Sequence, residues 1–311
     1  MYYPYLRGKQ FELAALQEMA SRGKLNGELV HPVIEPVRRN MAKLTSTLAT
    51  LRDAQVESYL VINPQVGEFK DDNSVLLDFC RKNNGEFKII PAILILSGTD
   101  GKRIVSEIKR NVPNAEKIAL IIWKNIEFRQ EDINALNLQD KDLELFFYRV
   151  PDRAIEQFTT ENKMLIFDGF TKQSKNADYP EYDYFSDIPL EYSEGDFHGF
   201  GDFQTIGEGY SESGGPVKAV AIHLTYSNKD GYDVIECRHF VSGDGAVIAE
   251  RYMNALSKLI NFREQHPNLF IDSLGLQGLV DLYERKHFPG LGVLKKLSIM
   301  HHIETIVSLV E

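Results

Sequence analysis

Short apolar runs recur along the first half of the chain at a nearly constant interval. The central runs are continuous rather than alternating, which is typical of strands buried on both faces of a parallel sheet. Stretches with apolar residues at spacings of three and four separate them, as amphipathic helices require. The strand-like runs are LVHPVIEPV (29–37), YLVINP (59–64), FKIIPAILIL (87–96), KIALIIW (117–123) and LELFFYRV (143–150). This alternation predicts a parallel sheet with helical crossovers.

The strand pattern continues less regularly in the second half. The runs there are MLIFDGF (164–170), the weak DIPLEY (187–192), VKAVAIHLTYS (217–227) and its hairpin-like follower YDVIECRHFVS (232–242). Eight strands of the βα kind would close a barrel. The alternative is an open doubly wound sheet. Such a sheet usually has a Gly-rich loop after its first strand, but here the first strand-like run ends in Glu35-Pro36 with no glycine. We therefore expect an α/β fold, a TIM-barrel-like (β/α)8 with an irregular second half.

Helical patterns flank the strands at both ends. Residues 10–21 form one amphipathic pattern, 246–265 a longer one and 300–310 a third, after a Gly-rich stretch. We expect a single barrel-like domain over the whole chain. Its expected parts are an N-terminal helical region (1–25), the barrel (26–245) and a C-terminal helical region (246–311).

The segment from 176 to 216 has an unusual composition. It holds ten acidic residues and no lysine or arginine, in a chain whose formal net charge is -10. It also contains nine Phe and Tyr residues. We expect a long, ordered acidic loop in which Phe197, Phe200 and Phe203 turn inward while the carboxylates line the outer face.

Composition excludes several classes of function. The acidic balance, with a sequence pI of about 5.4, argues against direct nucleic-acid binding, which needs clustered Lys and Arg. No run reaches the roughly 18 apolar residues of a membrane span, and none at the start resembles a signal peptide. Cys80 and Cys237 are expected to be buried free thiols. We therefore expect a cytoplasmic protein with no membrane association.

Several motifs resemble those of the "Beta protein" family of bacteria and phages. They are Tyr3-Pro4-Tyr5-Leu6-Arg7-Gly8-Lys9-Gln10 with Glu12 and Leu16, Pro32-Val33-Ile34-Glu35-Pro36, Gly199-Phe200-Gly201-Asp202-Phe203, Ala221-Ile222-His223-Leu224-Thr225-Tyr226, Arg238-His239-Phe240, and Gly290-Leu291-Gly292 before His301-His302-Ile303. Together they span most of the chain. The resemblance implies a prokaryotic intracellular protein of mobile-element or phage-conflict (antiviral defence) contexts. It supplies no catalytic residues.

Ligands of parallel barrels bind where the strands end, and this rule selects candidate residues by position. Glu35, Arg149 and Asp168 each follow an apolar run. Glu35 is either a general acid or base, or the partner of an arginine such as Arg149. Arg149 could clamp a phosphate or carboxylate, or pair internally with Asp152 or Asp168. We expect Glu35, Arg149 and Asp168 to converge at one rim. The same rule also selects Asn63, Trp123, Lys124, Asp152, Arg153 and His223.

The acidic segment offers a second set of candidates. Asp196, His198 and Asp202 are candidates for ligand or partner binding, as is His223 outside the segment. Their spacing matches no known metal loop, so we expect no metal and no cofactor. His301 and His302 are adjacent on a predicted helix and cannot both point one way.

Two functions remain open. One is an accessory or sensor component of a phage-conflict system, acting through a protein partner or a small ligand. The other is a barrel-type hydrolase or lyase with its acid–base and anion-clamping site at the barrel mouth. The GxSxG, HExxH, P-loop and CxxC motifs are all absent, which argues against the commonest hydrolase, NTPase and zinc classes. The oligomeric state stays open.

Overall fold

The computed structural model describes residues 1–96, 103, 110, 117–137, 139, 142–212, 218–228, 233–243, 245 and 247–311. The chain divides into two compact units, and each is described by itself. The barrel unit comprises Met1–Lys9, Leu25–Phe167 and Glu191–Asp202. The second unit comprises Gln10–Lys24, Asp168–Leu190 and Phe203–Glu311.

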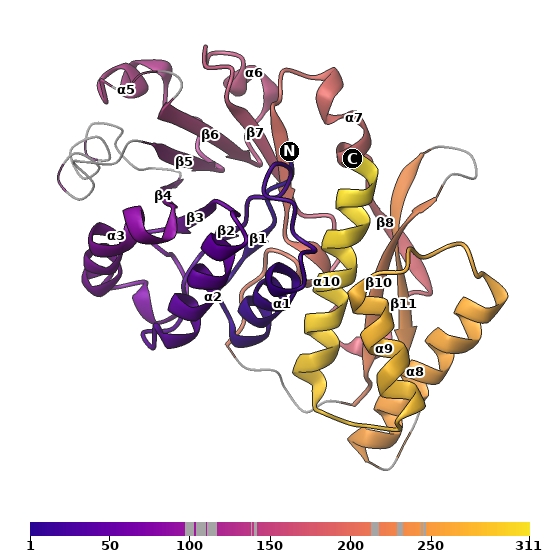
Figure 1. The fold of residues 1–311 in the computed structure, drawn as a ribbon. Helices are drawn as coiled ribbons and strands as arrows, with labels where there is room; N and C mark the ends of the chain where they lie inside the picture. Colours follow the sequence, from indigo (N-terminus) through magenta and orange to yellow (C-terminus); the bar gives the residue numbers. More distant parts are fainter. Residues whose placement is uncertain are drawn as a thin grey trace. The chain divides into compact units, whose positions relative to one another are not determined.

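The barrel unit is built on eight strands that pair only in parallel, in the order β1-β2-β3-β4-β5-β6-β7-β9 (Figure 1). They are β1 (Tyr5–Leu6), β2 (Val33–Ile34), β3 (Ser58–Val61), β4 (Ile89–Leu96), β5 (Ile118–Trp123), β6 (Leu143–Tyr148), β7 (Lys163–Phe167) and β9 (Gly199–Asp202). Phe200 N donates to Met1 O at 3.0 Å, and Tyr3 N donates to Phe200 O at 2.8 Å. These bonds join the last strand to the start of the first, so the barrel is nearly closed.

The predicted fold class is therefore confirmed with the expected eight strands, although some of the segments that form them differ from those expected. The first strand, β1, lies within the first ten residues, where we expected only a lead-in to a helix. The expected seventh strand at 187–192 is wrong, because the short helix α7 (Ile188–Glu191) occupies it. The expected eighth strand, which begins at 217, lies outside the barrel. The strand that closes the barrel is β9, inside the acidic segment.

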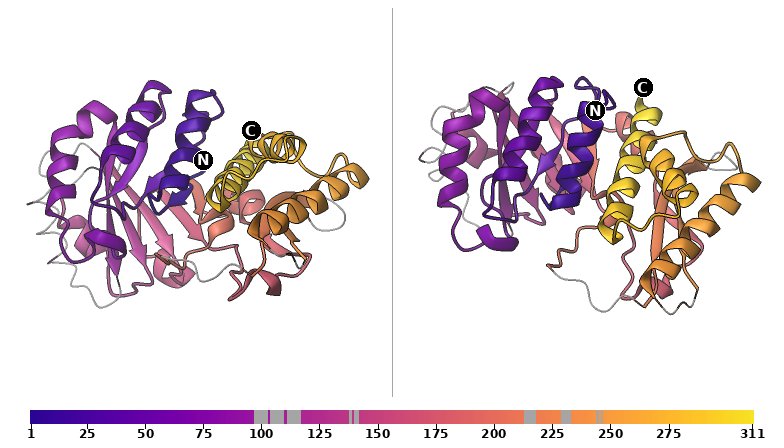
Figure 2. Two further views of the ribbon diagram at one scale, coloured as in Figure 1. Left: turned by 90° about the horizontal axis from the view of Figure 1, so that it is seen from below. Right: turned by 60° about the horizontal axis from the view of Figure 1, so that its bottom comes forward.

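Helices follow most of the barrel strands. Those described are α2 (Ala42–Asp53), α3 (Ser74–Phe87), α5 (Gln130–Asn134) and α6 (Asp152–Ile155), with the 3-10 turns η1 (Gly67–Phe69) and η4 (Tyr192–Glu194). α2 buries Leu44, Leu48 and Leu51 on one stripe, as its apolar spacing predicts. Figure 2 shows α2 and α3 on the outer side of the strands. The chain between β4 and β5, where the sequence pattern also predicts a helix, lies largely outside the described residues.

The second unit contains an antiparallel sheet in the order β10-β11-β8. Its strands are β8 (Tyr182–Ser186), β10 (Ala221–Asn228) and β11 (Val234–Val241). Its helices are α1 (Gln10–Ser21), α8 (Ile248–Gln265), α9 (Leu274–Glu284) and α10 (Leu291–Val310), with the 3-10 turns η3 (Asn176–Asp178) and η5 (Gln204–Ile206). The hairpin of β10 and β11 confirms the predicted pairing of these two runs. We had expected this hairpin to belong to the barrel over 26–245, but it forms part of a separate sheet.

Glycines explain why α9 was not recognised as a helix. A Cβ atom at Gly275 would lie 2.2 Å from the Leu297 carbonyl oxygen, and one at Gly278 would lie 2.6 Å from Leu297 Cδ2. Both glycines therefore allow α9 to approach α10 closely, although glycine lowers helix propensity. The predicted helices at 10–21 and 246–265 are confirmed, and α10 begins earlier than 300.

The described residues of the acidic segment do not form a single long loop. Its residues form β8 of one sheet, β9 of the other, and short helical turns between them. Phe200 and Phe203 are buried, as predicted, whereas Phe197 is only half-buried. Asp202 is fully buried, so the expectation that the carboxylates line an outer face is wrong for this residue. No described helix combines the length and apolar character needed to cross a membrane.

Candidate ligand site at the barrel mouth

Alternating side chains fill the barrel interior in layers. Tyr3, Tyr59 and Phe146 meet edge-on near the amino ends of the strands, with ring centroids 5.1–5.6 Å apart. Tyr59 also donates a hydrogen bond to Glu144, and burial raises the pKa of Glu144. This layer closes the amino end of the barrel, where side chains commonly serve stability rather than chemistry.

A buried charge pair lies at the opposite end, which we call the barrel mouth. Glu35 follows β2 and is fully buried, and Arg7 follows β1 and is 8% exposed. Glu35 Oε2 accepts hydrogen bonds from Arg7 and from the Tyr5 hydroxyl (2.7 Å), while Oε1 accepts one from Gln65 N (3.0 Å). A buried carboxylate requires such compensation. Both carboxylate oxygens are therefore engaged within the barrel unit.

An aromatic cluster lies beside this charge pair. The Trp123 ring is 4.3 Å from the Tyr148 ring and 5.9 Å from the Tyr5 ring. The Arg7 guanidinium carbon lies 5.7 Å from the centre of the Trp123 ring. Cations over aromatic faces are attracted by the ring quadrupole, so the cluster helps to hold Arg7 in place.

Two further cations follow the neighbouring strands β5 and β6. Lys124 comes directly after Trp123, and Arg149 comes directly after Tyr148. Lys124 Nζ lies 5.5 Å and Arg149 Cζ lies 5.3 Å from the centre of the Tyr148 ring. Lys124 N also donates to Tyr148 O at 2.9 Å, which ties the two strand ends together. Both side chains are exposed.

Backbone conformation distinguishes these two positions from most other left-handed residues of the chain. Lys124 has φ = 53° and Arg149 has φ = 50°. Other non-glycine residues with positive φ, namely Gln55, Lys88, Asn137 and Lys286, come just after helices, where a left-handed residue is a common ending. Lys124 and Arg149 instead follow strands. The left-handed conformation costs each of them about 1–2 kcal/mol in conformational strain. Strain at strand ends is a feature of functional sites.

The structure brings only part of the predicted catalytic set together. Glu35 and Arg149 both lie at the barrel mouth, linked through Arg7, Trp123 and Tyr148. One alternative from the sequence paired Glu35 with Arg149. In the structure Glu35 pairs with Arg7 instead. Within the described part of the chain, no carboxylate lies within ion-pair distance of Arg149.

Asp168 belongs to the second unit, and its convergence with Glu35 and Arg149 stays a prediction. Its carboxylate accepts hydrogen bonds from Phe170 N (3.3 Å) and Glu208 N (2.9 Å). These bonds order the chain after β7, as a turn-forming aspartate does.

The second predicted set is dispersed. Asp196 and His198 are exposed just before β9, whereas Asp202 accepts a hydrogen bond from the Tyr2 hydroxyl at 2.8 Å in a fully buried position. His223 lies on β10, in the second unit, beside His239. The binding roles expected for these residues stay predictions.

Sequence reasoning missed Arg7 and Tyr5, because it did not recognise β1. A usable signal was present: Tyr3, Tyr5 and Arg7 alternate along the chain, and alternation places such residues on one face of a strand. His301 and His302, which the sequence argued could not both point one way, are both buried on α10. His301 Nδ1 lies 2.7 Å from Ser273 Oγ, and His302 Nδ1 lies 2.9 Å from Thr225 Oγ1.

Comparisons with known proteins add little to this geometry. No protein-family model matches the chain, and no curated protein matches it. Among solved structures, a chitinase from Chromobacterium violaceum ATCC 12472 is similar with a TM-score of 0.35 and 10% sequence identity, over 84% of this chain and 90% of that chain. A likeness of this degree carries no argument about function.

Proposed function

We propose that the barrel mouth binds a small anionic molecule that carries a phosphate or carboxylate group. The observation that carries this proposal is the pair of strand-end cations. Lys124 and Arg149 both adopt a left-handed conformation after neighbouring strands and both lie over the Tyr148 ring. Guanidinium and ammonium groups at the carboxyl ends of barrel strands suit an anion, and Arg149 can bind it with two parallel hydrogen bonds.

The buried pair beneath these cations supports a positioning role for Glu35. Its two oxygens already accept hydrogen bonds from Tyr5, Arg7 and Gln65. Glu35 is thus better suited to fixing Arg7 than to exchanging a proton with a ligand. This favours ligand binding over the alternative of a hydrolase or lyase that uses Glu35 as its acid or base.

The sequence resemblance to the Beta protein family remains part of the proposal. An accessory or sensor role in a phage-conflict system would be compatible with a barrel that binds a small ligand. We keep cytoplasmic location and a protein partner as elements of the same proposal.

The test is to identify what the protein carries. The chain would be purified under native conditions and the released small molecules analysed by mass spectrometry. We expect an anionic compound near one equivalent per chain, and its loss from a Lys124→Gln/Arg149→Gln double variant. Lys88→Gln is the matched control, because Lys88 is also exposed and left-handed (φ = 52°) but precedes β4, at the amino end of the barrel.

Recovery of the same compound, in equal amount, from the double variant would contradict the proposal. Equal loss from Lys88→Gln would also contradict it, because the effect would then follow net charge rather than the strand-end position.

A further inference from the structure

Four residues with metal-binding side chains lie on one face of the antiparallel sheet. Cys237 and His239 are two residues apart on β11, so they point the same way. His223 on β10 is the register partner of His239, and Asp183 on β8 is the register partner of Cys237. The alternate residue Arg238 lies over the Phe262 ring of α8, 4.3 Å from its centre. The sheet register thus gathers Asp183, His223, Cys237 and His239 on the other face.

The two ring nitrogens of His239 face different groups. Nε2 lies 3.1 Å from Asp183 Oδ1. Nδ1 lies 2.7 Å from His223 Nδ1 and 3.9 Å from Cys237 Sγ. Ligand atoms of Asp183, Cys237 and His239 all fall within 4.8 Å of one another. A carboxylate that holds one nitrogen of a histidine while the other faces further donors is the usual arrangement around a protein-bound metal ion.

The surroundings of the cluster are apolar. Cys237 is 0% exposed and His239 is 5% exposed. The Tyr179 ring packs 4.5 Å from the His223 ring and 4.9 Å from the His239 ring, and Phe170 packs 4.9 Å from His223. Burying several polar side chains in such a shell is costly unless they share strong interactions.

We propose that Cys237, His239 and His223 bind a divalent transition-metal ion of the zinc type, with Asp183 orienting His239. A thiolate and two imidazoles are ligands that Zn²⁺ prefers. Tetrahedral zinc with ordinary bond lengths separates two ligand nitrogens by roughly 3.3 Å, and a nitrogen and a sulfur by roughly 3.6 Å. The observed 2.7 Å between the two nitrogens and 3.9 Å between nitrogen and sulfur each lie within about 0.6 Å of these values. The thiolate and the Asp183 carboxylate would balance the charge of the ion.

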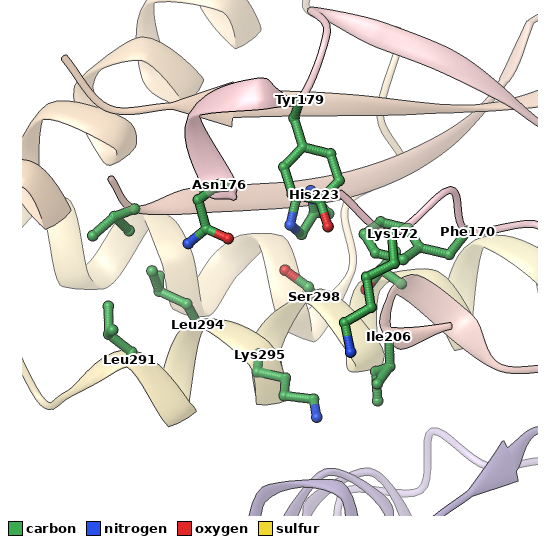
Figure 3. Close-up of a pocket in the computed structure, with 13 residues that line it drawn as sticks. Phe170, Lys172, Asn176, Tyr179, Ile206, His223, Leu291, Leu294, Lys295 and Ser298 are labelled. Atoms are coloured by element: carbon green, nitrogen blue, oxygen red, sulfur yellow. The ribbon is translucent and has the colours of Figure 1, made fainter. Parts of the chain in front are cut away.

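A cavity of about 260 Å³ adjoins the cluster within the second unit. His223 and Tyr179 line one side of it, and the amino groups of Lys172 and Lys295 point to the opposite side (Figure 3). His223 thus connects the buried cluster with the cavity. The cavity offers a path for the ion and room for a water molecule as fourth ligand.

The test uses Co²⁺ as a spectroscopic probe of the full chain after treatment with a chelator. We expect one Co²⁺ per chain, a near-ultraviolet band from thiolate ligation, and displacement by Zn²⁺. Cys237→Ser should abolish that band. The matched control is Cys80→Ser, because Cys80 is the other buried thiol but lies on α3 in the barrel unit, and it should leave binding unchanged.

Two further variants separate ligands from the orienting residue. His223→Gln should weaken Co²⁺ binding at least tenfold and should fold even if Cys237→Ser does not, because His223 is less buried than Cys237 and lies at the cavity wall. Asp183→Asn should weaken binding about 10–100-fold while keeping the thiolate band. The absence of stoichiometric Co²⁺ binding would overturn the proposal, as would a thiolate band that persists in folded Cys237→Ser. The cluster would then be a hydrogen-bonded core in which two histidines share a proton.

Discussion

The two sheets of this protein place their polar chemistry differently. In the barrel, the polar residues that matter follow the ends of the strands, as Glu35, Lys124 and Arg149 do. In the antiparallel sheet, His223 and His239 sit within the strands and meet across the register. A parallel barrel buries both faces of each strand and so leaves only the ends for charged groups. An antiparallel pair can gather polar groups laterally on one face.

This difference predicts that disruption of the barrel mouth has the larger cost in stability. Glu35→Gln removes the charge that compensates buried Arg7 and should lower the free energy of unfolding by about 3–5 kcal/mol. The measurement is urea unfolding followed by circular dichroism. Asp78→Asn is the control, since its pair with Arg81 is exposed, and it should change stability by less than about 0.5 kcal/mol. Similar losses of unfolding free energy in both variants would show that the buried pair contributes no more to stability than an exposed pair.

Acid should act on the second unit through His301. Burial lowers the pKa of His301 to about 4, from 6.5. Above pH 6.5 the imidazole is neutral in both folded and unfolded chains, so stability is complete there. Between pH 6.5 and 4 the unfolded chain binds the proton first, and the free energy of unfolding should fall by about 3 kcal/mol.

The measurement for His301 is the slope of stability against pH, rather than stability itself. His301→Gln should flatten the slope between pH 6.5 and 4 by the amount attributed to this residue. An unchanged slope in His301→Gln would contradict the assignment.

Closure of the barrel gives a smaller expected effect. A Cβ atom at Gly201 would lie 2.2 Å from the Tyr3 carbonyl oxygen, beside the bonds that join β9 to the start of the chain. Gly201→Ala should therefore cost about 1–3 kcal/mol in the free energy of unfolding. Gly85→Ala on α3 has open space around it and should gain about 1 kcal/mol. Equal effects of the two substitutions, measured by thermal unfolding, would argue against a tightly closed barrel.

The same contrast explains what the sequence could predict. The continuous runs that became β3 to β7 mark buried parallel strands, and the strand-end rule selected Glu35, Lys124 and Arg149. Strand β1 has only two residues, so the short alternation of Tyr3, Tyr5 and Arg7 was not recognised as a strand and Arg7 was missed. β9 carries Gly199 and Gly201, which lower strand propensity but allow the close approach of the first strand.

The cluster on the antiparallel sheet was not predictable in the same way. The hairpin that pairs His223 with His239 was predicted, but Asp183 on β8 is far from it along the chain, and only the pairing of β8 with β11 brings Asp183 to Cys237 and His239. Register depends on long-range pairing, which local patterns do not encode.

Anion binding at the barrel mouth is tested most directly by titrating inorganic phosphate into the protein by calorimetry at low and high salt. The wild type and Lys88→Gln should bind equally, and binding should weaken as salt is raised. Lys124→Gln/Arg149→Gln should bind at least about tenfold more weakly, since each charge-assisted hydrogen bond contributes roughly 1.5–3 kcal/mol. Equal phosphate affinity in the double variant and the wild type would contradict the account.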